Sequence, residues 1–225
     1  MAVPRQAVTA STALAAGQSR AGRITGGGTA GNERLTAVTG AVLLVLLGAL
    51  GVTIIQIGQL LWLHLFLGML LIGPVVLKLG STGYRFVRYY AGSPSYRHEG
   101  PPAALLRVMG PIVVISTVIV FASGVALLFA GPSSRNTLLP IHKVTFFVWL
   151  AFMALHILAH LPKILPALRV DYGRRPDLGL EVTGRSGRVL ALAGALAAGL
   201  VLAVLVIPEF GSWVHDSGLF HHHHG

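Results

Sequence analysis

The chain has 225 residues, of which 54% are hydrophobic and only 11% are charged, and its mean hydropathy is +0.74. A soluble domain carries roughly a quarter charged residues, so a soluble fold of this length could not hide so much apolar surface. The net charge of +10 would suggest nucleic acid in a soluble protein, but the basic residues stand between apolar runs, and we expect no nucleic-acid partner. The absence of cysteine excludes disulfides, cysteine-ligated iron–sulfur clusters and c-type haem attachment.

The N-terminal part of the chain divides into a polar tail and an apolar hairpin. Residues 1–36 are rich in Ala, Gly, Ser and Thr, and we expect a disordered tail on the cytoplasmic side. Membrane spans are predicted at 37–57 and 61–83, each near the ~20 residues that cross the hydrocarbon. Gly58 and Gln59 would form the turn between them, and Pro74 is expected to kink the second span.

Three further spans follow, so the fold class is all-α and integral to the membrane. They are predicted at 106–130, 138–161 and 189–207, with Pro162 helping to end the fourth. The transmembrane domain then covers 37–210 with about five transmembrane helices, and residues 211–225 form a His-rich tail.

The basic residues indicate the orientation. Of the 17 Lys and Arg residues, 15 fall in the N-terminal tail, between spans two and three, or between spans four and five. Only Arg135 and Lys143 belong to the other side. The positive-inside rule therefore places the N-terminus in the cytoplasm and the C-terminus outside a bacterial plasma membrane.

Five ionisable residues within the spans need an explanation, because such groups are costly in hydrocarbon. They are His64, Lys78, His142, His156 and His160. Spans two and four run in the same direction, so His64 and His142 should lie at a similar depth near the outer face. His142 and His156 are fourteen residues apart, which on a helix is nearly the same face and roughly 21 Å along the axis. Lys78 follows His64 by the same interval.

Matched levels on facing helices favour a four-helix haem-binding bundle, in which each iron takes one axial nitrogen from either side. The metal ligands predicted for haem iron are His64, His142 and His156, with His160 and Lys78 as further cofactor-binding candidates. Ligation by two imidazoles leaves no open coordination position, which favours electron transfer over oxygen chemistry.

The stretch IHKVTFFVWLAFMALHILAH resembles the ligand helix of membrane b-type cytochromes, a group that includes the cytochrome b561-like and ferric-reductase-like four-helix proteins. LHLFLGMLLIGPVVLKLG is similar to the partner helix. STGYRFVRYYAGSPSYRHEGPP also resembles a loop of small actinobacterial membrane proteins. The resemblance covers roughly residues 37–165 and implies two stacked haems. Where that pattern has a second histidine, this chain has Lys78, which can instead extend to the headgroups. We therefore expect one haem b, on His64 and His142, with a second, on His156 or His160 opposite Lys78, as the weaker alternative.

The function favoured by this pattern is transmembrane electron transfer by a b-type cytochrome, as the membrane subunit of a larger redox enzyme or as a small quinol- or metal-linked reductase, with a quinone or a redox subunit as partner. Two alternatives stay open: a haem-free transporter or metal or proton pathway, and a structural assembly subunit. No Asp or Glu lies within a span, which disfavours cation transport. His221, His222, His223 and His224 could bind a transition metal outside the membrane.

Overall fold

The protein is a bundle of long α-helices. The computed structural model describes residues 28–92, 94, 104–130, 132–172 and 184–214, and over these residues it contains six helices and no strand. The helices are α2 (Gly28–Ile55), α3 (Ile57–Tyr90), α5 (Ala104–Phe129), α6 (Pro132–Tyr172), α7 (Arg185–Leu205) and α8 (Ile207–Val214). All except α8 are long and apolar enough to cross a membrane.

The outward surface of these helices is apolar. Val45 is 73% exposed and Ile55 is 83% exposed, and many other large apolar side chains share this position. Such a surface suits lipid and not water. The expected all-α, multi-pass membrane fold is therefore confirmed.

The first hairpin differs from its prediction at both ends. Helix α2 begins at Gly28, so residues 28–36 of the expected disordered tail are helical. They are anchored there, because the Asn32 side-chain amide donates to the Ser81 carbonyl at the far end of α3 (3.1 Å). The turn lies at Gln56 instead of residues 58–59, and α3 deviates from helical dihedral angles at Leu60, whereas Pro74 keeps helical ones.

Helix α6 exceeds its predicted bounds, and α8 is a short helix that was not predicted. Helix α6 continues through Pro162 to Tyr172, well past the expected end at 161. Proline removes one backbone hydrogen bond, and a long helix can absorb that loss without ending. Residues 211–214, expected in the C-terminal tail, belong to α8.

Helix α8 closes one end of the bundle. Phe210 is 1% exposed and packs in a core with Met69 of α3, Leu128 of α5 and Ala203 of α7. Arg135, at the start of α6, donates to the Ser212 carbonyl (3.0 Å) and lies 4.1 Å from the centre of the Trp213 ring. The short helix thus contacts four of the long ones.

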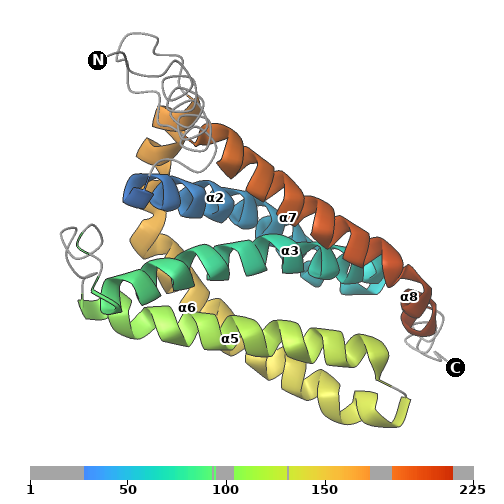
Figure 1. The fold of residues 1–225 in the computed structure, drawn as a ribbon. Helices are drawn as coiled ribbons and strands as arrows, with labels where there is room; N and C mark the ends of the chain where they lie inside the picture. The colour runs from blue at the N-terminus through green and yellow to red at the C-terminus, as the bar shows by residue number, and fades with distance from the viewer. Residues whose placement is uncertain (1–27, 93, 95–103, 131, 173–183, 215–225) are drawn as a thin grey trace, which may run out of the picture.

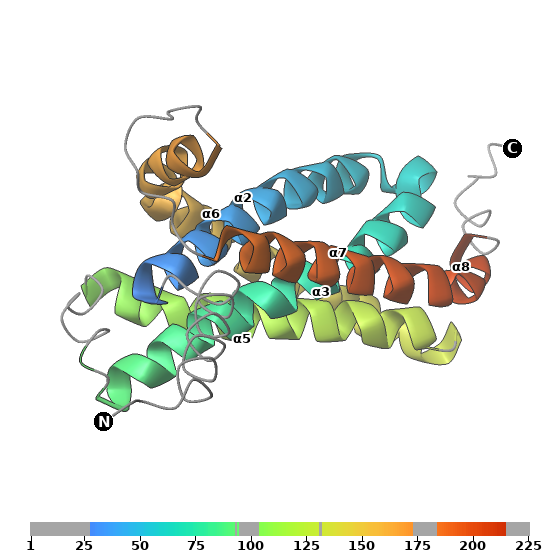
Figure 2. The same ribbon diagram turned by 45° about the horizontal axis from the view of Figure 1, so that its top comes forward.

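Four helices form a square, and α7 lies outside it. Helix α2 packs on α3 and α5 packs on α6, while lighter contacts link α2 with α6 and α3 with α5 (Figures 1 and 2). Helices α3 and α6 therefore occupy opposite corners. Helix α7 packs along the outer side of α3. Two tightly packed hairpins, held together more loosely, make up the part of the bundle that carries the histidines.

Backbone contact between glycines joins α7 to α3. A side chain at Gly73 would meet the Ala195 carbonyl oxygen, and one at Gly199 would meet the carbonyl oxygen of Leu70. Small residues that allow such an approach are typical of helix interfaces in membranes, where packing replaces the hydrophobic effect. The contact requires glycine at both positions because the opposing atoms are backbone and cannot move aside alone.

We expect Gly199→Ala to lower the free energy of unfolding by about 1–3 kcal/mol, since the added methyl forces α7 away from α3. The matched control is Gly194→Ala on the same helix, where the new methyl meets open space. Thermal unfolding in detergent, followed by circular dichroism, compares the two. Equal unfolding midpoints for both variants would contradict the close packing.

Candidate functional site

His64 and His142 approach each other across the square. His64 lies near the start of α3 and His142 near the start of α6, on helices at opposite corners that run in the same direction. Both side chains are partly buried, and they are near enough for electrostatic interaction between the two imidazoles. The structure thus brings together the two residues that the sequence paired by depth.

The hydroxyl of Thr53 fixes the His64 ring. Thr53 is 1% exposed on α2, its Oγ1 lies 2.9 Å from His64 Nδ1, and it donates to the Leu50 carbonyl of its own helix (2.6 Å). A hydroxyl has one proton, so Thr53 can only accept from His64. In the neutral ring the proton is therefore on Nδ1, and Nε2 keeps its lone pair.

The same arrangement recurs at His142. Ser123 Oγ of α5 lies 2.8 Å from His142 Nδ1 and donates to the Val120 carbonyl (3.0 Å). Ser123 must then accept from the ring, which again leaves the lone pair on Nε2. Gly124 lets the ring lie close against α5, because a methyl there would be 3.2 Å from His142 Cε1.

The donor set fits axial ligation of haem iron. A ligating histidine generally donates its other ring N–H to a fixed acceptor, which sets the tautomer and raises the basicity of the ligand. Both imidazoles meet that requirement through separate helices, α2 and α5. Because α3 and α6 are not neighbours in the square, the two histidines approach each other without direct packing of their helices.

Sequence reasoning did not identify Thr53 and Ser123. Each hydroxyl comes from a different helix than the histidine that it contacts, so periodicity along one helix does not pair them. Their only signal in the sequence is a polar residue within an apolar span, and Thr39, Ser116 and Thr117 give the same signal without contacting His64 or His142 through a described hydrogen bond.

Lys78 lies toward α2. Its Nζ donates to the Thr36 carbonyl, and Gly40 provides the space for the amine. The hydroxyls of Thr36 and Ser81 form a hydrogen bond (3.0 Å) beside it, and Asn32 contacts the same Ser81 through its carbonyl. This polar cluster holds the lysine amine within the α2–α3 hairpin.

The remaining candidates are less fully described. His156 is partly buried in α6. The backbone of His160 belongs to the same helix, but its side chain lies outside the described residues, as do His221, His222, His223 and His224. Within the described part of the chain, no three His, Asp or Glu side chains form a group that could hold a metal ion. Haem iron needs only two such ligands.

The chain was compared with known proteins. No protein-family model, curated protein or solved structure matches it.

We expect nitrogen chemical shifts to report the tautomer directly. In protein labelled with ¹⁵N-histidine and kept free of haem, His64 and His142 should each show a protonated Nδ1 and an unprotonated Nε2. Ser123→Ala should remove this preference at His142 alone. The control is Ser116→Ala, since Ser116 is on the same helix and its hydroxyl donates to the Val113 carbonyl (3.2 Å). A protonated Nε2 in the unmodified protein would contradict the assignment.

Proposed function

We propose that the chain is a membrane cytochrome of the b type that transfers electrons, with one haem b held by His64 and His142. One observation carries the proposal: two imidazoles on opposite helices each place Nδ1 within hydrogen-bond distance of a hydroxyl that also donates to a carbonyl of its own helix. When bound, haem supplies reversible one-electron chemistry at its iron. The fold supplies two nitrogen ligands of fixed orientation.

The residues around the ligands have separate tasks. Thr53 and Ser123 hold the ring planes and prevent the tautomer in which Nε2 carries a proton. Gly124 keeps α5 from crowding the His142 ring. His64 and His142 would both ligate the haem iron and leave it no open position for oxygen, which favours electron transfer as the reaction class.

One haem is the stoichiometry that we favour. The second site expected from the sequence needs a ligand on α3 at the level of His156, where the chain has Lys78. The Lys78 amine already donates to the Thr36 carbonyl on α2. Ligation would require that hydrogen bond to break and the amine to lose a proton, which supports the single site.

The electron donor and acceptor lie outside this chain in our proposal. The sequence carries neither a Rossmann nor a Walker fingerprint. A membrane quinone or a redox subunit would exchange electrons with the haem, which makes the chain the electron-transfer subunit of an oxidoreductase.

We expect His64→Ala and His142→Ala each to abolish the Soret and α bands in a reduced-minus-oxidised spectrum, because each removes one axial ligand. His156→Ala is the matched control on the same helix as His142 and should keep the bands. Protein purified from haem-replete cells should hold one haem per chain.

Added imidazole distinguishes loss of a haem ligand from misfolding of the variant. It should restore the bands of His142→Gly by occupying the vacated position. A colourless parent protein would overturn the cytochrome proposal and favour a transport or assembly role. Bands that persist in both His64→Ala and His142→Ala would remove the proposed ligands.

The orientation proposed is N-terminus in the cytoplasm of a bacterial plasma membrane. Described basic residues support it, because Arg34, Arg85, Arg88, Arg185 and Arg188 share one end of the bundle, with Arg135 and Lys143 at the other.

Since the chain has no cysteine, single-cysteine reporters can test this orientation. A membrane-impermeant maleimide on intact cells should label Ser133→Cys at the start of α6 and spare Ser186→Cys at the start of α7. Both positions are exposed. Labelling of Ser186→Cys alone would reverse the orientation.

A further inference from the structure

Trp149 closes the face of α6 that carries the histidines. It follows His142 by seven residues and precedes His156 by seven, so the three side chains share one face of the helix. The Trp149 side chain is 7% exposed, whereas both histidines are only partly buried. Seven residues of helix correspond to about 10 Å along the axis. A closely packed position therefore lies about 10 Å from His142, on the side toward His156.

A hydrogen bond to α5 holds the indole in place. Trp149 Nε1 donates to Oγ1 of the buried Thr117 (2.9 Å). Indole nitrogen is a donor only, so inside hydrocarbon it needs an acceptor of this kind. The hydrogen bond between Ser123 and His142 joins the same two helices one level away. The Phe146 ring, one turn after His142, lies 6.0 Å from the Trp149 ring, so aromatic side chains continue from the histidine to the indole.

The opposite helix is closed at the matching position. Leu71 follows His64 by seven residues on α3 and is fully buried. Because α3 and α6 run in the same direction, Leu71 and Trp149 lie at a similar depth, each seven residues beyond a histidine. The level of the two imidazoles is thus followed by a level of large, buried side chains.

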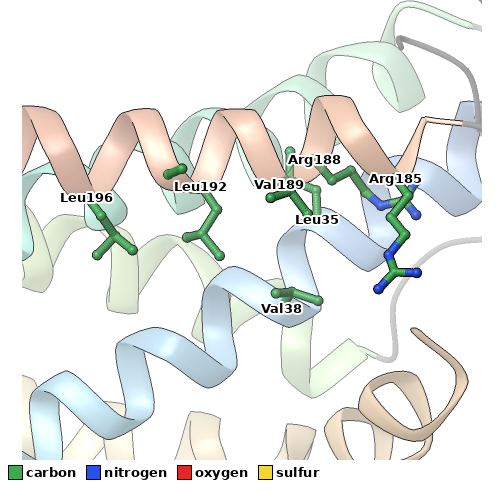
Figure 3. A pocket seen from close by; sticks show the side chains of 8 residues that line it. Leu35, Val38, Arg185, Arg188, Val189, Leu192 and Leu196 are labelled. Carbon is green, nitrogen blue, oxygen red and sulfur yellow. The ribbon is translucent and has the colours of Figure 1, made fainter. Parts of the chain in front are cut away.

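A groove described elsewhere in the structure does not reach this level. It lies between α2 and α7, with Val38 and Leu192 along its apolar length and Arg185 and Arg188 at one end (Figure 3). Its lining residues belong to α2 and α7, so no residue of α6 borders it. Trp149 is therefore no part of the wall of that groove.

We propose that Trp149 forms the inner wall of the haem site, on the side toward His156; this inference rests on the proposed function. A large aromatic ring fixed by a hydrogen bond covers apolar surface and keeps water out. The apolar shell around a metal controls solvent access and thereby the reduction potential. Water would stabilise the additional positive charge of ferric iron. Trp149 is thus a positioning residue that also keeps the potential high.

Substitution of Trp149 in the full chain, loaded with haem, tests the wall. We expect Trp149→Ala to make the reduction potential more negative and to speed the transfer of haem to a soluble acceptor protein roughly ten-fold. Trp149→Phe keeps an aromatic wall and should stay near the parent protein. The matched control is Phe147→Ala, which removes a ring that is 66% exposed on the same helix and should change neither measurement.

The acceptor of the indole hydrogen bond provides a milder variant. Thr117→Val removes the hydroxyl at nearly constant volume, and we expect a smaller change of the potential in the same direction as in Trp149→Ala. The control is Ser116→Ala, because the neighbouring Ser116 hydroxyl donates to the Val113 carbonyl of its own helix. This pair decides the proposal if Trp149→Ala does not fold.

The outcomes separate this inference from the cytochrome proposal. A parent-like potential and parent-like haem transfer in Trp149→Ala, with the Soret and α bands present, would overturn the wall and leave ligation by His64 and His142 standing. Equal changes in Trp149→Ala and Phe147→Ala would overturn it in favour of a general loosening of α6. A colourless parent protein would overturn the cytochrome proposal, and this inference with it.

Discussion

A polar group within hydrocarbon must find its hydrogen-bonding partner inside the protein, and this constraint shapes the centre of the bundle. His64 and His142 meet it through Thr53 and Ser123, whose own protons are already donated to helix carbonyls. Each ring is therefore held in one tautomer by a chain of two hydrogen bonds. Water could satisfy the rings in either tautomer, but in an apolar bundle the hydroxyls select one.

The arrangement of the helices determines where the two oriented imidazole rings lie. Because α3 and α6 are at opposite corners of a square, their imidazoles approach each other without a packed interface between the two helices. The tight contacts are elsewhere, within each hairpin and between Gly73 and Gly199 on α3 and α7. The proposed haem would lie between the two hairpins, where the helix contacts are lighter.

The polar cluster around Lys78 has a different role from the histidine pair. Lys78 is held on α2 by Thr36, with Asn32 and Ser81 beside it, so this cluster ties the start of α2 to the end of α3. The same tie holds the first turns of α2 against the end of α3. The arginines at this end then lie where helices enter the membrane, and two of them border the groove between α2 and α7.

Much of the fold could be predicted from the sequence, because hydropathy is local: each span is apolar along its own length and needs no partner to be recognised. The relative depth of His64 and His142 also follows from counting residues along parallel helices. The ends of the helices could be predicted less well from the sequence, because α6 passes Pro162 and α2 includes residues that are held in place by contacts with α3.

The sequence by itself therefore determined that the protein spans a membrane, the number of its long helices and the matched depth of His64 and His142. Only the tertiary structure decided that Thr53 and Ser123 orient these rings, that Lys78 bonds to α2, and that α7 meets α3 at two glycines. The physical reason is that each of these contacts joins different helices. Periodicity along one helix gives the direction of a side chain and does not give the partner that it meets.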